Sequence, residues 1–214
     1  SKDTKFNFIG FGTMNGKDGK PFKTRDGGVM KLDSLLEEIK EKTAKYVENN
    51  EQMSEEEQKD VANKVAVAAL KYADLIPNAE KDYIFDLDKF CSLEGKTGPY
   101  ILYSAVRMKS LLSKAGDIEL KLNDIYSQTE KDIITKVLEM PIRIDKSYRN
   151  RTLSDLTEYI YEIDSLFNKF YGENRILTEE DIDKKQSWLF ITNLVYEVNK
   201  LILDVLAINI PDRM

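Results

Sequence analysis

The strongest constraint on the fold is a repeating spacing of apolar residues in two long segments of the C-terminal half. Segments 153–170 and 191–208 each place an apolar side chain at alternating steps of three and four residues. This spacing puts the apolar side chains on one face of an α-helix, and such faces are buried when helices pack together. We therefore predict two long helices that pack on each other within a bundle.

Local start signals agree with a helical fold. At Ser54-Glu55-Glu56-Glu57 the serine side chain can accept a hydrogen bond from the Glu57 amide while Glu57 bonds back to the serine amide, an arrangement called a capping box. The helix that begins there is expected to end before Pro77. The same spacing of a hydroxyl and an acidic residue predicts three further helix starts, at Ser127, Thr152 and Thr178.

Residues 1–31 follow a different pattern. Phenylalanine and isoleucine recur between residues 6 and 11, a glycine-rich connection follows, and residues 22–24 can form a returning strand. This order predicts a small β-hairpin with a turn at its tip. From Leu32 to Tyr46 the apolar spacing becomes helical. We therefore predict a mainly α protein with a small N-terminal β-hairpin.

A change in organisation is expected between residues 76 and 98. Thr97-Gly98-Pro99 predicts the start of a new helix, because proline is favoured in the first helical turn, and Gly116 is typical of a helix end. The early helices then give way to the bundle. We predict two domains, residues 1–96 and residues 97–214.

The composition excludes several kinds of chemistry. No histidine occurs among the 214 residues, so the commonest metal ligand and every histidine-dependent triad are absent, and we expect no metal site. Cys91 is the only cysteine, which rules out an intrachain disulfide and favours a reducing compartment, best the cytoplasm. No uncharged apolar run approaches the ~20 residues of a membrane-spanning helix, so we expect no membrane partner.

Charge is distributed unevenly along the chain. The whole chain carries 32 basic and 38 acidic residues, a net charge of −6. Residues 1–31 instead carry seven basic and three acidic residues, and residues 143–151 carry four basic residues, one acidic residue and Tyr148. We interpret the second segment, which follows Pro141, as a basic, irregular connection. It either contacts phosphate or is a solvated surface, and its composition favours neither.

The stretch GKDGKPFKTRDGG at residues 16–28 is a candidate phosphate-binding loop. A P-loop needs four residues between its two glycines and a serine or threonine directly after its lysine. Neither Lys17 nor Lys20 meets these requirements. From spacing alone, an exposed hairpin tip without chemistry is the favoured interpretation.

Several stretches in register change that interpretation. In chain order they are FGTMNGKDGKPFKTRDGGVMKLDSLLEE, VAVAALKYADL, DYIFDLDKFCSLEGKTGPYILYSAVRMKSLL and the terminal IPDRM. With these stretches the chain resembles the arginyl-tRNA synthetase family from about residue 6 to the last residue. The resemblance implies a ligase that uses ATP to attach arginine to its tRNA. It implies that residues 1–96 contain the end of the class I catalytic domain with connecting helices, and that residues 97–214 are an α-helical anticodon-binding domain.

By this resemblance Lys20 and Lys23 belong to the KMSKS-like loop and are the candidate catalytic and ATP-binding residues. Their ammonium groups would stabilise the charge that develops as pyrophosphate leaves. ATP is implied as the cofactor, with Mg²⁺ as its counter-ion in the intact enzyme, and no cofactor is expected to bind tightly to this chain alone. The family's HIGH signature requires histidine, and the chain starts at Ser1 without methionine. We interpret the chain as cut from a longer protein and expect it to be inactive by itself.

The resemblance also implies tRNA contacts on the bundle. The candidates are Tyr103, Arg107, Tyr171 and Met214, with Arg149 of the basic segment as a phosphate contact. Bases of an RNA loop are read by stacking on aromatic side chains and by basic contacts to phosphates. Each candidate has a structural alternative: the tyrosines can be core residues, Arg107 can pair with a helix carboxylate, and Met214 can be a frayed end.

The expected partners are arginine-specific tRNA and, for the intact enzyme, arginine and ATP, with the chain a monomer. The alternative is a helical protein-interaction module without nucleic-acid function. The net negative charge and the acidic stretch EQMSEEEQKD at residues 51–60 support that alternative. The salt dependence of tRNA binding distinguishes the two hypotheses.

Overall fold

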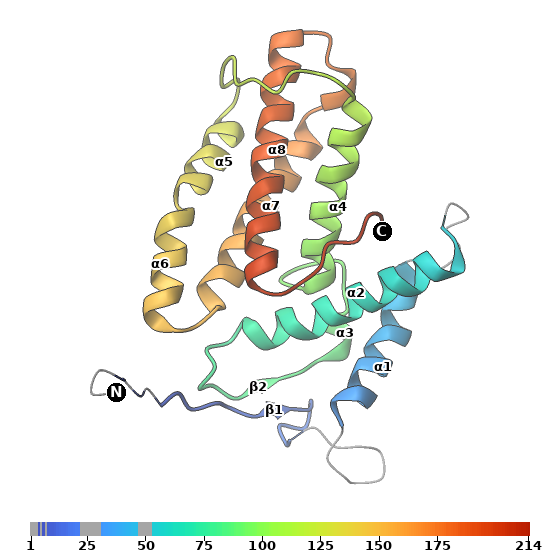
Figure 1. Cartoon of the computed structure of the whole chain (residues 1–214), viewed down its shortest axis with the longest axis vertical. Coiled ribbons are helices and arrows are strands. Elements are labelled where there is room, and N and C mark those ends of the chain that lie inside the picture. Colours follow the sequence, from blue (N-terminus) through green and yellow to red (C-terminus); the bar gives the residue numbers. More distant parts are fainter. Residues whose placement is uncertain (1–3, 5, 7, 22–30, 47–52) are drawn as a thin grey trace.

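The computed structural model describes residues 4, 6, 8–21, 31–46 and 53–214 and is mainly helical (Figure 1). Its elements in chain order are β1 (Met14–Asn15), α1 (Leu32–Thr43), the 3-10 turn η1 (Ala44–Tyr46), α2 (Glu55–Leu75), β2 (Tyr83–Ile84), α3 (Leu87–Phe90), α4 (Gly98–Ala115), α5 (Gln128–Leu138), α6 (Met140–Asn150), α7 (Ser154–Glu173), the 3-10 turn η2 (Ile176–Thr178) and α8 (Ile182–Val205). The expected mainly α class is confirmed. Over the described ranges, no helix combines the length and the apolar character needed to cross a membrane.

The C-terminal half is a bundle in which α4, α5, α7 and α8 pack around one core and α6 lies against α7 (Figure 1). As their apolar spacing predicts, α7 and α8 contact each other, and they bury Phe167, Phe170 and Trp188. Leu201 and Val205 belong to the predicted apolar face but are 44% and 47% exposed. A seven-residue repeat drifts by ~20° per repeat around a straight helix, so the end of that face turns away from the core.

The start of α4 crosses closely over α2. Thr97 caps α4 by accepting a hydrogen bond from the Tyr100 amide at 3.2 Å, and Pro99 lies in the first turn as expected. A Cβ atom on Gly98 would lie 2.2 Å from the carbonyl oxygen of Ala68, so glycine is required for this approach. The crossing fixes α4, which carries part of the candidate site, against α2.

The small sheet differs from the predicted hairpin. β1 and β2 are parallel, with Met14 opposite Tyr83. Within the described residues, one antiparallel bridge, between Asn15 and Pro21, matches the hairpin. The expected returning strand at residues 22–24 lies outside the described residues. Sequence patterns suggest strand partners that are close along the chain, whereas β2 comes from a distant segment.

Of the four helix starts predicted from the spacing of a hydroxyl and an acidic residue, two are correct. Ser54 forms the complete capping box with Glu57, and Ser127 accepts a hydrogen bond from the Glu130 amide. The predictions at Thr152 and Thr178 are wrong, because α7 starts at Ser154 without a side-chain cap and η2 continues to Thr178. The cap of α8 is Asp181, the acidic residue of the predicted pair, whose carboxylate accepts hydrogen bonds from two amides of the first turn.

The predicted irregular connection at residues 143–151 is also wrong, because this segment belongs to α6 (Met140–Asn150). Pro141 lies in the first turn of α6, where the missing amide hydrogen breaks no helical bond. An ion pair between Arg149 and Asp145, one turn apart, supports the helix. α6 ends at Asn150, and Arg151, the residue that caps this end, has a left-handed φ of 53°.

Candidate nucleic-acid interface

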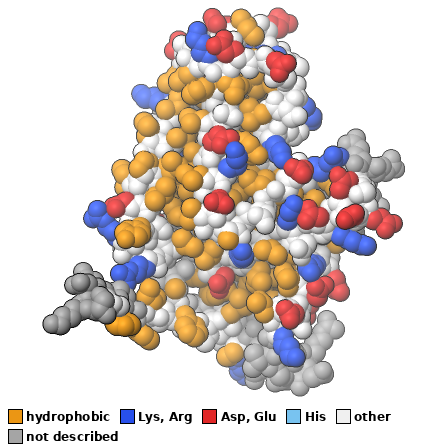
Figure 2. Space-filling view, viewed as in Figure 1, with side chains coloured by type: hydrophobic (Ala, Val, Ile, Leu, Met, Phe, Trp, Pro, Cys, Tyr) orange, Lys and Arg blue, Asp and Glu red, His pale blue; other side chains and the backbone are white. Residues whose placement is uncertain are grey.

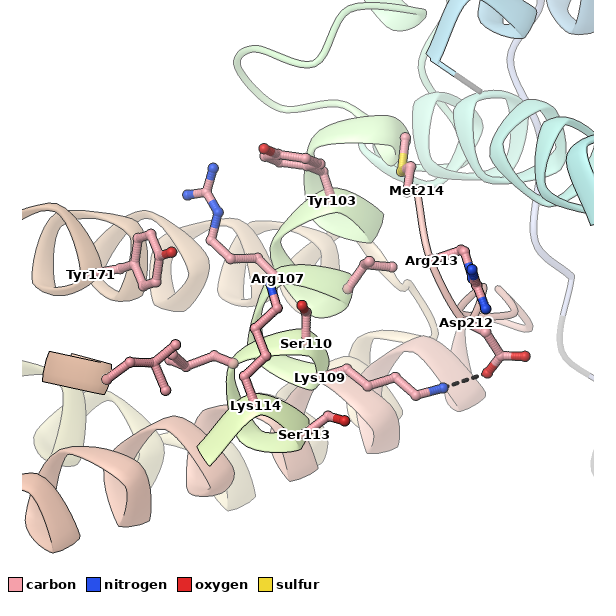
Figure 3. Close-up of a pocket in the computed structure, with 13 residues that line it drawn as sticks. Tyr103, Arg107, Lys109, Ser110, Ser113, Lys114, Tyr171, Asp212, Arg213 and Met214 are labelled. Atoms are coloured by element: carbon pink, nitrogen blue, oxygen red, sulfur yellow. Dashed lines mark hydrogen bonds and ion pairs between the residues drawn. The ribbon is translucent and has the colours of Figure 1, made fainter. Parts of the chain in front are cut away.

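A groove of about 570 Å³ lies between α4, the end of α7, η2 and the segment that follows α8 (Figure 3). The structure brings four of the predicted tRNA-binding residues together along it: Tyr103, Arg107, Tyr171 and Met214. They come from three segments that are far apart in the sequence. The fifth, Arg149, is not part of this groove.

The two tyrosines reach the surface of the groove. Tyr103 is 37% exposed and Tyr171 is 38% exposed, so neither is a core residue, which contradicts the structural alternative for both. Tyr171 rests on the buried ring of Phe167, with ring centroids 6.2 Å apart. Such half-exposed rings offer one apolar surface to a ligand.

Arg107 lies between the two tyrosines. Its Cζ atom is 4.7 Å from the ring centroid of Tyr103 and 5.1 Å from that of Tyr171, so the guanidinium makes cation-π contacts with both rings. Tyr103 and Arg107 are one turn apart on α4 and therefore share a face. Arg107 Nη1 donates a hydrogen bond of 2.7 Å to the Asn168 side-chain oxygen. Its partner is thus an amide of α7 and not the helix carboxylate of the alternative interpretation.

Asn168 connects Arg107 to two hydroxyl groups. Its side-chain nitrogen donates to the Tyr100 hydroxyl and to the Ser104 hydroxyl, both at 2.9 Å. Sequence reasoning did not assign Asn168 or Tyr100 to the site. The available signal was the position of Asn168 on the predicted helix, next to the apolar face and one turn before Tyr171.

The groove carries more basic than acidic side chains. Besides Arg107 it is lined by Lys109, Lys114 and Arg213, with Asp212 as the acidic residue. Lys109 and Asp212 form an ion pair, and the Lys109 ammonium lowers the pKa of the Asp212 carboxyl (Figure 3). The remaining positive charge makes the groove suitable for a polyanion.

The segment after α8 runs back beside α4 (Figure 1) and brings Met214 to the groove (Figure 3). Ala207, with a left-handed φ of 53°, turns the chain at the end of α8, and its carbonyl accepts a hydrogen bond from the Lys71 ammonium. Ile208 is then buried. Met214 is half-buried against the bundle core, which contradicts the alternative of a frayed end.

The described part of the candidate phosphate-binding loop, residues 16–21, directly follows β1, and none of these residues lines the groove. Lys20 is exposed in a turn in which its carbonyl accepts the Gly16 amide at 2.8 Å and its own amide donates to Asp18 at 3.1 Å. Gly19 has a φ of 70°, which glycine adopts without strain. Lys23 lies outside the described residues.

Lys17, which the sequence did not single out, fixes the start of this loop. Its ammonium lies 3.1 Å from a carboxylate oxygen of Asp86 and 3.1 Å from one of Asp88. Lys42 of α1 also pairs with Asp88. Hydrogen bonds from Lys42 and Lys17 lower the pKa of the Asp88 carboxyl to about 2, because they stabilise its ionised form.

Arg149 lies on the exposed side of α6, where its Nε atom is 2.8 Å from Asp145. Lys146 pairs with Asp155, and Arg143 pairs with Glu139 and Glu162. Figure 2 likewise shows basic and acidic side chains interspersed over one face of the molecule. Within the described residues, no cluster of three or more histidine, cysteine or acidic side chains could hold a metal ion.

Two family models match the chain, one over its N-terminal part and one over its helical bundle. Residues 1–87 match the catalytic domain of class I tRNA synthetases (R), and residues 101–214 match the DALR anticodon binding domain. The second match includes all four residues that the groove brings together.

Curated relatives and solved structures agree with these matches. An arginine–tRNA ligase from Alkaliphilus oremlandii is 40% identical over 217 residues, covering 100% of this chain and 37% of the relative. One from Agathobacter rectalis is 42% identical over 224 residues, covering 99% of this chain and 38% of the relative. This chain therefore spans less than two-fifths of the length of these relatives.

The fold is similar to that of solved synthetases. The Thermus thermophilus arginyl-tRNA synthetase matches 95% of this chain with a TM-score of 0.83 and 22% identity, over 35% of its own length. The Plasmodium falciparum arginyl-tRNA synthetase matches 92% of this chain with a TM-score of 0.71 and 24% identity, over 36% of its own length.

Proposed function

Because the chain belongs to the arginyl-tRNA synthetase family, we propose that its groove binds the anticodon loop of arginine tRNA. Within that family, the chain is the end of the class I catalytic domain followed by the DALR anticodon-binding domain. The observation that supports this most directly is the stack of Tyr103, Arg107 and Tyr171 at the surface. Unstacked RNA bases bind to aromatic rings and guanidinium planes of this kind.

We further propose the roles that the rest of the chain has in the intact protein. The intact protein is an arginine–tRNA ligase that uses arginine, ATP and Mg²⁺, and residues 1–96 and 97–214 are its C-terminal catalytic segment and its anticodon-binding domain. Lys20 and Lys23 bind the triphosphate, and Arg149 contacts tRNA phosphate. We also propose that the protein is a monomer and is located in the cytoplasm. The free, buried thiol of Cys91 is consistent with a reducing compartment.

RNA binding by this chain tests the proposal. A labelled hairpin with the arginine anticodon loop is titrated with the protein at several salt concentrations, and a hairpin of the same stem with an all-uridine loop is the control. We expect tighter binding of the anticodon loop, and an affinity whose logarithm falls by about 0.7 per contacted phosphate for each unit of log salt. Equal or absent binding of both hairpins contradicts the proposal and favours a protein-interaction module.

A second measurement tests the proposed dependence on the rest of the enzyme. We expect the purified chain to show no pyrophosphate exchange with arginine, ATP and tRNA, since it lacks the histidines of the HIGH signature. Exchange above background, dependent on both arginine and tRNA, contradicts this part of the proposal.

A further inference from the structure

We infer that Asn168 is a positioning residue for RNA recognition: it holds the Arg107 guanidinium between Tyr103 and Tyr171, with the remaining N–H donors available to a base. The inference rests on the proposed function of the groove and goes beyond it, because it assigns a role to a residue that does not itself need to contact RNA. Its basis is the set of hydrogen bonds that Asn168 makes between α4 and α7.

The hydrogen bonds leave the Asn168 amide one orientation. Its oxygen accepts from Arg107 Nη1 at 2.7 Å, and its nitrogen donates to the hydroxyls of Tyr100 and Ser104. A flipped amide would point its two N–H donors at a guanidinium, which has no acceptor. Ser104 is fully buried, so this end of the network is also fixed by packing.

Holding Arg107 in place matters because arginine is a long, flexible side chain. The guanidinium lies against both rings, and the hydrogen bond to Asn168 restricts its rotation further. The entropy that a free arginine would lose on binding RNA is then lost before RNA arrives. Figure 3 shows the guanidinium between Tyr103 and Tyr171, projecting away from α4 into the groove.

The remaining donors define the chemistry of the ligand. A guanidinium has five N–H donors in a planar fork, and Asn168 accepts one of them. Among the described residues, Arg107 contacts the Asn168 amide and two tyrosine rings and forms no ion pair with a carboxylate. The fork therefore suits an unstacked base with two neighbouring acceptors on one edge, as in guanine O6 and N7 or cytosine O2 and N3, stacked against one of the tyrosines.

A double-mutant cycle tests the inference. The affinity for the arginine anticodon hairpin is measured by fluorescence anisotropy for the wild type, Asn168→Ala, Arg107→Met and the double variant. We expect Asn168→Ala to weaken binding by about tenfold in the wild-type background, the order expected for losing one charge-assisted hydrogen bond, and by less than about twofold when Arg107 is already methionine. An equal loss in both backgrounds overturns the inference, because Asn168 then acts independently of Arg107.

A matched control separates positioning from general packing. Asn123 also bonds between segments, donating to the Asp183 carbonyl at 3.1 Å and the Gln186 side chain at 2.9 Å, but it does not line the groove. We expect Asn123→Ala to leave hairpin affinity unchanged. A loss similar to that of Asn168→Ala overturns the inference.

A readout without RNA keeps the inference separate from the proposed function. In the wild type, the two Nη groups of Arg107 should give resolved NMR signals because rotation of the guanidinium is hindered, and in Asn168→Ala these signals should merge. Asn168→Asp keeps the acceptor, and the hydroxyls of Tyr100 and Ser104 can turn to donate to its second oxygen, so the resolved signals should remain. Merged signals in the wild type overturn the inference. If the wild type binds no hairpin but its resolved signals merge in Asn168→Ala, the proposed function fails while the positioning of Arg107 by Asn168 is confirmed.

Discussion

The groove and the basic segment of α6 both combine arginine with exposed tyrosine, but they differ in what holds the arginines. In the groove, Arg107 contacts two rings and an amide, which leave its charge uncompensated. On α6, Arg149 faces Asp145. A basic stretch in a sequence therefore says little about binding until the partners of its side chains are known, because a neighbouring carboxylate weakens the attraction for phosphate.

The largest expected effect contrasts these two arginines. Arg107→Ala should weaken binding of the arginine anticodon hairpin by roughly 10- to 100-fold, the range for a lost base contact, whereas Arg149→Ala should change it by about twofold or less. Anisotropy titrations at one salt concentration provide the comparison. The contrast between the groove and α6 breaks down if Arg149→Ala has the larger effect.

A smaller effect is expected for the ring beneath the base. Tyr171→Ala should weaken hairpin binding by roughly tenfold, since a stacked base contributes about 1–3 kcal/mol. The half-exposed ring contributes little to the core, so thermal unfolding should remain cooperative. Tyr159→Ala is the control: Tyr159 is fully buried, and its removal should lower the free energy of unfolding by about 3–5 kcal/mol. Loss of cooperative unfolding in Tyr171→Ala would restore the interpretation of this tyrosine as a core residue.

A substitution at Asp164, one turn before Asn168 on α7, should change the free energy of unfolding without changing RNA binding. Asp164 is fully buried and accepts a hydrogen bond from Asn199, yet one oxygen of each side chain has no partner. Asp164→Asn can donate to the unpartnered Asn199 oxygen, so the free energy of unfolding at pH 7 should rise by about 1 kcal/mol with hairpin affinity unchanged. Chemical denaturation and anisotropy measure the two quantities.

Asp164→Asn should also change how the free energy of unfolding depends on pH. Burial raises the pKa of Asp164 well above its usual value, so the folded state keeps a proton that the unfolded state loses as pH rises above about 4. Stability therefore falls as pH rises from there toward the folded-state pKa. We expect Asp164→Asn to reduce this fall. An unchanged pH profile would contradict the assignment of the raised pKa to Asp164.

The smallest effect is expected at Lys17, at the start of the candidate phosphate-binding loop. Lys17→Ala removes exposed ion pairs to Asp86 and Asp88, which contribute little to global stability, so the melting temperature should barely change. Amide hydrogen exchange in residues 14–20 should nevertheless become faster, because the start of the loop loses its attachment to α3. Unchanged exchange there would show that the backbone bonds of β1 hold the loop without Lys17.

Apart from α3 and α6, the helices and their order could be predicted from the sequence, because periodicity and capping act within a few residues. The structure confirms the capping box at Ser54, the proline at the start of α4 and the two long helices of the bundle. The errors also have local causes. An acidic residue near a threonine can itself be the cap, as Asp181 is, and a basic stretch after Pro141 can be helical when proline lies in the first turn.

By itself, the sequence determined a mainly α chain with the stretches of a synthetase family, along with Tyr103, Arg107, Tyr171 and Met214 as the candidates for its anticodon site. Only the tertiary structure decided that these four line one groove, that Asn168 connects Arg107 to α7, and that β1 pairs with a distant strand. The physical reason is range: helix signals depend on neighbouring residues, whereas the partner of an arginine or a strand depends on how distant segments pack.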